Sequence, residues 1–207
     1  MLTSTGELIV HTYTPRQIEI IKASVKLIGR KGISALTTRN ISKALGVTEP
    51  IIYRHFRNKT EILAGILSFL EESNRKIATA VVQQEAPALE RIEELYMRHF
   101  SGFARTPALT SAIFSEELYP NDRVLARGVL RIMEVTKQAI MKILNEGIKN
   151  KEIQALISPE QMAFIIMGSM RFAVTTWRLN KFKSDLVAEG KELCRSFWVL
   201  FSVRITA

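Results

Sequence analysis

The sequence predicts an all-α fold, with an N-terminal three-helix unit followed by a larger helical body, about nine helices in total. Glycine and proline, which interrupt regular structure, number only ten and six among 207 residues. The long segments between them place apolar residues three or four positions apart, which is the spacing of one helix face. The apolar fraction of 47% is sufficient for a packed core.

The first helix is expected to begin after Thr14. Thr14 is a good N-cap, Pro15 suits the first helical position, and Gln17 is placed to complete a capping box. Gly32 suits the left-handed residue that follows a last turn. The apolar face of this helix would consist of Ile18, Ile21, Val25 and Ile28. Residues 1–13 show no periodic pattern and are expected to form a mobile arm.

Two short helices separated by a tight turn are predicted next. Thr37 can cap the first of them, and Ile41 and Leu45 share its inner face at i, i+4. Gly46 suits the left-handed end of this helix, and Val47 would fill the turn.

The second short helix is expected to follow Thr48, which is placed as its N-cap with Pro50 in the first turn. Ile52 and Phe56 form its inward i, i+4 pair. Two short helices that cross over one small core are typical of the helix-turn-helix. The segment from Thr37 to Lys59 is therefore predicted to be a helix-turn-helix.

The outward side chains of the second short helix suit a DNA groove. Arg54 can donate two hydrogen bonds to guanine, Glu49 can accept one from cytosine, and Ile51 can contact a thymine methyl. Tyr53 and His55 can bond to bases or phosphates. This helix is therefore interpreted as the one that reads DNA.

Further residues are available to the DNA backbone. Thr38 and Arg39 lie at the start of one helix and Lys59 at the start of the next, where amides and side chains can hold phosphate. The alternative is a small three-helix packing unit whose polar residues only form its water-exposed surface and contact no DNA. The predicted DNA-binding residues are Thr37, Thr38, Arg39, Thr48, Glu49, Pro50, Ile51, Tyr53, Arg54, His55 and Lys59.

Positive charge is concentrated in the N-terminal part of the chain. Residues 1–60 contain ten Lys and Arg against three acidic residues, whereas the remainder contains 19 against 17. Basic side chains neutralise phosphates and release counterions, so a polyanionic partner is indicated. A merely solvated basic surface is the alternative explanation of the charge alone.

Three segments of this region closely resemble the N-terminal signature of the tetracycline-repressor (TetR) family. They run from Gly32 to Arg39, from Leu45 to Val47 and from Tyr53 to Lys59. The resemblance implies a sequence-specific transcriptional regulator, a repressor that an effector releases from a palindromic operator. By the same resemblance, DNA contacts fall on Thr38, Arg39, Glu49, Pro50, Ile51, Tyr53, His55 and Lys59.

The body is predicted from its helix signals. Asn58 with Glu61 repeats the capping pattern at the start of a long helix, and prolines delimit candidate helices at about 88–104, 109–117 and 121–149. Ser158 with Gln161 opens another helix, and Ser184 or Asp185 begins the last one. The expected division is an arm at 1–13, a helix-turn-helix domain at 14–60, and a regulatory and dimerisation domain at 61–207.

The last two helices carry more apolar side chains than a monomer core requires. The residues of this apolar surface are Phe164, Ile165, Gly168, Phe172 and Trp177 on the first of these helices and Leu193, Phe197, Leu200 and Phe201 on the second. Pairing with the same helices of a second copy would give a four-helix homodimer interface, as the family resemblance implies. The alternative is that these residues serve only the core.

An apolar cavity in the body is expected to bind a small apolar or aromatic effector, with His99 or Arg171 orienting a polar group. Plain core packing is the alternative for every residue of this set. The candidate ligand-binding residues are Tyr96, His99, Phe100, Phe103, Phe114, Met133, Met167, Met170, Arg171 and Trp177.

Other function classes find little support. The chain has three histidines and one cysteine, Cys194, with no nucleophile and base pattern, metal-ligand spacing or phosphate-binding glycine loop. We therefore expect no catalytic residue, metal or cofactor, and the lone thiol fits a reducing cytoplasm. The most apolar segment, 162–177, is shorter than a membrane-spanning helix and contains Arg171. Besides an enzyme, the second alternative is a DNA-binding protein without an effector, an architectural or constitutive factor.

Overall fold

The computed structural model describes residues 13–107, 110, 113–114 and 122–203. Eight α-helices lie within these residues: α1 (Pro15–Lys31), α2 (Thr38–Leu45), α3 (Glu49–His55), α4 (Lys59–Val82), α5 (Ala88–Arg105), α7 (Arg123–Lys149), α8 (Pro159–Leu179) and α9 (Leu186–Phe201). The prediction of an all-α fold is confirmed. The expected arm, apart from Tyr13, and most of the expected helix at 109–117 lie outside the described residues.

The helix starts follow the predicted capping chemistry. The hydroxyls of Thr14 and Ser158 each accept a hydrogen bond from the backbone amide of the third helical residue, Gln17 or Gln161. The side chain of that glutamine in turn accepts from the backbone amide of the cap residue. The Asn58 side chain accepts from the amide of Glu61. Two details were wrong. Gly32 has φ 77° and ψ 172°, a positive φ outside the left-handed helical region, and the Thr48 side chain makes no capping hydrogen bond.

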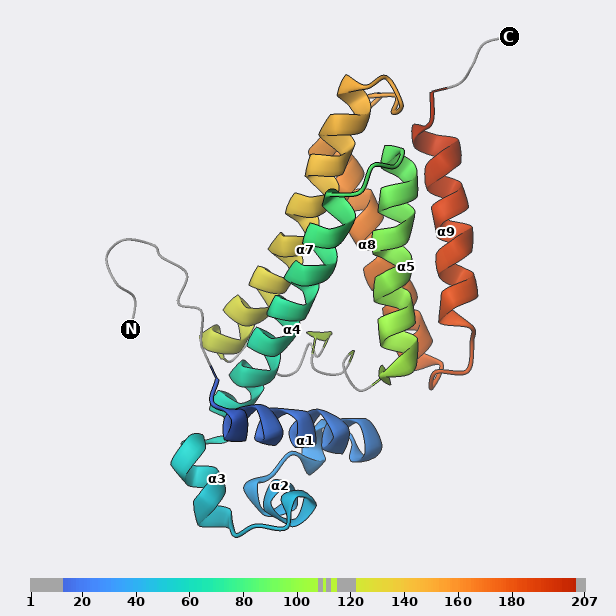
Figure 1. The fold of residues 1–207 in the computed structure, drawn as a ribbon. Coiled ribbons are helices and arrows are strands. Elements are labelled where there is room, and N and C mark those ends of the chain that lie inside the picture. Colours follow the sequence, from blue (N-terminus) through green and yellow to red (C-terminus); the bar gives the residue numbers. More distant parts are fainter. Residues whose placement is uncertain (1–12, 108–109, 111–112, 115–121, 204–207) are drawn as a thin grey trace.

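The three N-terminal helices lie together at one end of the molecule, with α1 across the end of α4 (Figure 1). Helices α4 and α7 run side by side from this end, and α5 and α9 form a second adjacent pair. Only three residues separate the end of α3 from the start of α4, so the two helices are closely connected along the chain.

Two apolar cores meet part of the way along α4 and α7. The head core consists of Ile20, Ile21, Leu27, Ile28, Leu36, Ile41, Ile52, Phe56, Ile62, Leu63, Ile66, Leu67, Leu70, Leu125, Val129 and Ile132. The body core begins at Ala78 on α4 and at Ala139 on α7 and includes the buried side chains of α5, α8 and α9. The first half of α4 and the start of α7 thus pack with the N-terminal helices.

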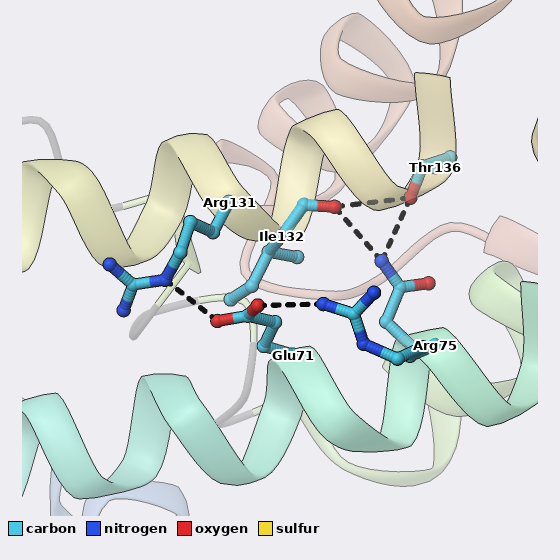
Figure 2. A network of polar contacts seen from close by, with 6 residues as sticks. Glu71, Arg75, Arg131, Ile132 and Thr136 are labelled. Carbon is cyan, nitrogen blue, oxygen red and sulfur yellow. Dashed lines mark hydrogen bonds and ion pairs between the residues drawn. The ribbon is translucent and has the colours of Figure 1, made fainter. Parts of the chain in front are cut away.

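Polar contacts join α4 to α7 between these two cores (Figure 2). The Glu71 carboxylate pairs with Arg75 on its own helix at 3.0 Å and with Arg131 on α7 at 2.8 Å. The buried Asn74 amide donates to the Ile132 carbonyl and to the Thr136 hydroxyl, both at 2.9 Å. The buried amide has the greater structural weight, because partly exposed ion pairs contribute only about 0–1 kcal/mol each.

Candidate DNA-binding surface and ligand cavity

Helices α2 and α3 form the predicted helix-turn-helix. The Thr37 hydroxyl accepts from the amide of Asn40 at 3.1 Å, and Gly46 closes α2 in the left-handed conformation with φ 66° and ψ 33°. Ile41, Ile52 and Phe56 are buried in the head core, as their spacing predicted. A β-carbon at φ 66° would be strained, so the tight turn requires the glycine.

The predicted DNA-binding residues lie on α2, on α3 and at their ends, and none of them is buried. Tyr53 and Arg54 are exposed on α3, whereas Ile51 and His55 are half-buried. Lys59 is exposed at the start of α4, with its Nζ 3.5 Å from the carbonyl of Ile33. The remaining predicted contacts are exposed at Thr37, Arg39, Thr48 and Pro50 and half-buried at Thr38 and Glu49.

Glu49 has a partner within the protein that the sequence did not indicate. The Thr38 hydroxyl lies 2.7 Å from Glu49 Oε2, and the Tyr53 hydroxyl lies 3.3 Å from Thr38 Oγ1. Three residues that the sequence assigned separately to DNA therefore form one cluster between the starts of α2 and α3.

The body contains a cavity of about 460 Å³ among α4, α5, α7 and α8. Most of its wall is apolar, and its polar groups include Asn74, His99 and Thr136. Its lining residues are Leu70, Ser73, Asn74, Ile77, Arg98, His99, Gly102, Phe103, Ile113, Phe114, Val129, Leu130, Ile132, Met133, Glu134, Thr136, Lys137, Glu160, Phe164, Met167, Gly168, Met170 and Arg171. Ligand sites are commonly apolar cavities of about 300–1,000 Å³ with a few polar groups.

The structure brings most of the predicted ligand-binding residues to this cavity. They are His99, Phe103, Phe114, Met133, Met167, Met170 and Arg171. The sequence missed the contributions of α4 and of the remaining α7 positions, and also those of Arg98, Gly102, Ile113, Glu160, Phe164 and Gly168. Since Leu70, Val129 and Ile132 are buried at helical spacing, their pattern indicated only a packed face.

Tyr96, Phe100 and Trp177 do not line the cavity, so their placement there is corrected. Tyr96 stacks on Phe100 with ring centroids 4.6 Å apart and meets the edge of Phe197 on α9 at 5.4 Å. The Trp177 indole donates to the carbonyl of Ser184 at 3.0 Å. These aromatic side chains pack toward α9 and the loop before it, which helical spacing alone could not reveal.

A hydrogen-bonded group lies at the cavity wall where α4, α5 and α7 meet. His99 Nδ1 is 2.7 Å from the Leu95 carbonyl, and its Nε2 is 2.9 Å from Asn74 Oδ1. Burial lowers the pKa of His99, and the hydrogen bond to the Leu95 carbonyl opposes that shift. The Arg171 guanidinium lies 5.6 Å from the centre of the Phe114 ring, within cation-π range.

Exposed apolar side chains gather on α8 and at the end of α9. Phe164, Phe172 and Leu179 on α8 are 80%, 74% and 78% exposed, and their spacing places them on one side of the helix. Val199 and Leu200 are exposed on α9. By contrast, Trp177, Phe197 and Phe201, which the sequence assigned to the same surface, are buried within the chain.

Comparison with known proteins identifies the family. Residues 20–66 match the family described as bacterial regulatory proteins of the tetR family, and residues 66–197 match the C-terminal region of YsiA-like proteins. The chain therefore belongs to the TetR family of transcriptional regulators, and its helix-turn-helix is a DNA-binding unit. Within the described residues, no helix has the length and apolarity needed to cross a membrane.

Individual relatives match nearly the whole chain. The fatty acid metabolism regulator protein of Bacillus subtilis is 29% identical over 179 residues, which cover 84% of this chain and 89% of that protein. The nucleoid occlusion factor SlmA of Aliivibrio fischeri is 28% identical over 193 residues, 92% of this chain and 95% of SlmA. The structure of the regulator FadR from Bacillus subtilis in complex with stearoyl-CoA has a TM-score of 0.75 at 27% identity, covering 86% of this chain and 95% of FadR.

Proposed function

We propose that this regulator is a repressor that leaves a palindromic operator when a fatty acyl compound occupies the body cavity. The cavity itself carries the proposal, because its wall is mostly apolar and is formed in part by α4, the helix that follows the helix-turn-helix. An acyl chain is an apolar ligand that such a wall can accept. The similarity to FadR, whose structure holds stearoyl-CoA, supports this ligand class.

The cavity is placed to act on α4. Leu70, Asn74 and Ile77 of α4 line it on one side, and Met167 and Met170 of α8 line it on another. A ligand that moves α4 relative to α7 would move α3 as well, since only a short connection separates α3 from α4. A hundredfold loss of operator affinity requires about 2.7 kcal/mol of coupling, which is within the usual range for allosteric regulators.

We also propose that the functional unit is a homodimer through α8 and α9. The exposed side chains of Phe164, Phe172 and Leu179 form an apolar surface of the kind that subunit interfaces cover. A symmetric dimer can set two copies of α3 about 34 Å apart, one turn of DNA, so that each reads half of a palindrome. In this arrangement residues 14–60 bind DNA and residues 61–207 bind the ligand and the second copy.

Operator release tests the proposal. A duplex selected from a random pool by the full-length protein serves as the operator, and its binding is followed by fluorescence anisotropy during titration with dodecanoate or dodecanoyl-CoA. We expect at least one of these acyl compounds to reduce operator affinity strongly. Operator affinity unchanged by both compounds would favour a regulator without an acyl effector.

A variant that fills the cavity sharpens this test. Gly102 lines the cavity, and a β-carbon there would meet no atom within 4 Å, so Gly102→Leu adds volume to the cavity without a backbone collision. We expect Gly102→Leu to bind the operator but to resist release by the acyl compound. Ser101→Leu, one residue away on α5 and outside the cavity lining, is the matched control and should release normally.

A further inference from the structure

His99 faces a hydrogen-bond acceptor at each of its two ring nitrogens. The Leu95 carbonyl lies 2.7 Å from Nδ1, and Oδ1 of Asn74 lies 2.9 Å from Nε2. A neutral imidazole has one N–H and can satisfy only one of these acceptors. The other contact would then set a nitrogen lone pair against an oxygen lone pair.

The Asn74 amide cannot be turned to remove this conflict. Its Nδ2 lies 2.9 Å from the Ile132 carbonyl and 2.9 Å from the Thr136 hydroxyl. Exchanging the oxygen and nitrogen of Asn74 would place its oxygen against the Ile132 carbonyl, which can only accept. Only the doubly protonated ring of His99, an imidazolium, satisfies every contact in the group.

The imidazolium has no counterion among the described residues, since none of their ion pairs involves His99. The charged residues of the cavity lining are Arg98 of α5, Glu134 and Lys137 of α7, and Glu160 and Arg171 of α8; the part of α4 that lines the cavity carries no charge. The lining therefore carries three cationic side chains and two carboxylates, and a protonated His99 would increase the excess of positive charge.

Most of these charges already have partners. Arg98 donates to Glu94 on α5 at 2.8 Å, and Lys137 lies 3.9 Å from Glu134. A buried cation without a counterion is costly, because a low-dielectric surrounding disfavours charge. The same burial lowers the pKa of His99. The hydrogen bonds around the ring therefore favour the proton, while the low-dielectric surroundings of the ring disfavour it.

We propose that His99 selects an acidic ligand: an acyl chain that ends in a carboxylate, which lies in the cavity as the counterion of the protonated His99. This inference rests on the proposed function and deepens it by naming the polar group of the effector. The hydroxyl of Thr136 can contribute, because its distance of 3.4 Å from the Ile132 carbonyl leaves it only weakly held. The chain of the ligand then contacts apolar residues such as Phe103 and Met167.

The position of this group gives the ligand's charge a route to the DNA-binding helices. Asn74 lies on α4 between Leu70, the last α4 residue of the head core, and Ala78, the first of the body core. When His99 is protonated, its Nε2–H donates to Asn74 and ties α5 to α4 at this junction. A carboxylate ligand thus stabilises one position of α4 that a neutral ligand of the same length does not.

Calorimetric titration of the full-length protein with dodecanoate and with dodecanol tests the inference. We expect dodecanoate to bind more tightly than dodecanol near pH 6 and to lose up to about tenfold in affinity per unit rise in pH above the pKa of His99. Dodecanol should show little pH dependence. Dodecanoate binding should also take up a proton, seen as a heat that varies with the ionisation enthalpy of the buffer. Dodecanoyl-CoA, whose thioester is uncharged, should behave like dodecanol within the cavity.

Two variants separate the role of His99 from general folding. His99→Gln cannot become cationic, so it should bind both compounds with equal and pH-independent affinity. Asn74→Asp supplies a carboxylate of the protein next to Nε2, so it should also lose the preference for dodecanoate. Circular dichroism checks that both variants fold. If only one variant folds, its binding data alone test whether His99 selects the carboxylate.

The outcomes distinguish the two proposals. Equal binding of dodecanoate and dodecanol by the wild-type protein, with operator release by either, would leave the proposed function standing and overturn the selection by His99. A pH dependence retained in His99→Gln would overturn it as well. If neither compound nor dodecanoyl-CoA binds, the proposed function and this inference both fail.

Discussion

The hydroxyl of Thr38 donates to Oε2 of Glu49 at 2.7 Å, joining the first turn of α2 to the first turn of α3. Because a hydroxyl carries one proton, the contact of 3.3 Å between Thr38 and Tyr53 requires the Tyr53 hydroxyl to be its donor. The lone pairs of Tyr53 are then left for DNA. A phosphate offers only acceptors, so this arrangement suits Tyr53 to a base amine instead.

Glu49→Gln and Glu49→Ala distinguish charge from positioning at this cluster. Glu49→Gln keeps an oxygen that accepts from Thr38 but removes a negative charge near the DNA. We expect it to bind operator and random duplex about fivefold more tightly at low salt. Glu49→Ala releases Thr38 and Tyr53, so its preference for the operator should fall. Anisotropy titrations over a salt series measure both effects, and an unchanged preference in Glu49→Ala would refute the positioning role.

The predicted DNA-binding residues Arg54, His55 and Lys59 should differ in what they contribute, either sequence specificity or general affinity for DNA. Arg54→Ala and His55→Ala should weaken operator binding more than random-duplex binding, since base contacts cost about 1–3 kcal/mol each when lost. Lys59→Ala should weaken both about equally and reduce the salt slope by about one. Competition titrations with random duplex give the comparison. The reverse pattern would exchange the assigned roles of these residues.

The helix-turn-helix was predictable because its determinants are local. Thr37 and Gly46 act within α2 through a cap and a left-handed residue, and neither depends on distant packing. The inward pair of Ile52 and Phe56 follows from helix period alone. The Glu49 partner was not predictable in the same way, because Thr38 lies on another helix and only the crossing of α2 and α3 brings the two together.

The cavity was predictable only in part. Met167 and Arg171 were named from residue type, which fits a cavity wall and a packed core equally well. Tyr96 lies one helical turn from His99, yet it faces α9 and not the cavity. Which side of α5 faces α9 depends on contacts between residues far apart in the sequence, and the helical spacing of apolar residues does not specify those contacts.

The close approach of α7 to α5 at Gly147 gives a stability prediction. A β-carbon at Gly147 would lie 2.5 Å from Cβ of Ala88 and 2.8 Å from Cδ1 of Ile153, and the former belongs to a residue with no flexible side chain. We expect Gly147→Ala to lower the free energy of unfolding by about 1–3 kcal/mol through overpacking. Chemical denaturation followed by circular dichroism measures this change.

Gly102→Ala is the matched control, because its β-carbon would meet nothing within 4 Å and Gly102, like Gly147, lies in the last turn of its helix. It should be neutral or raise stability by up to about 1 kcal/mol, the helix propensity difference. If the two substitutions had equal effects, the close contact at Gly147 would not be responsible.

Cys194 and Tyr96 predict a loss of stability at high pH. Burial raises the pKa of the Cys194 thiol from 9.0 to about 12 and also raises the pKa of the Tyr96 hydroxyl. Above pH 9 the unfolded chain releases the thiol proton while the folded chain keeps it, so the unfolded state gains stability. The midpoint of urea unfolding should therefore fall as the pH rises from 9 toward 12.

A Cys194→Ala variant tests the contribution of the thiol. It should be less stable near pH 7, because it loses buried volume, but its stability should fall less steeply above pH 9. Below pH 9 the stability of the two proteins should change with pH in the same way. If their stability also changed identically with pH above 9, the Cys194 thiol would not contribute to the loss of stability at high pH.

The exposed apolar surface of α8 predicts a dimer that one substitution can break. Phe172 is exposed in the single chain, so Phe172→Glu should leave the fold intact and place two carboxylates in the proposed symmetric interface. We expect analytical ultracentrifugation to show a monomer. Its operator affinity should be at least about tenfold lower, because two linked DNA-binding domains bind a palindrome more tightly than one. Leu156→Glu, which changes an exposed leucine outside α8 and α9, should remain dimeric and bind DNA normally. A dimeric Phe172→Glu protein with full operator affinity would place the interface elsewhere on the chain.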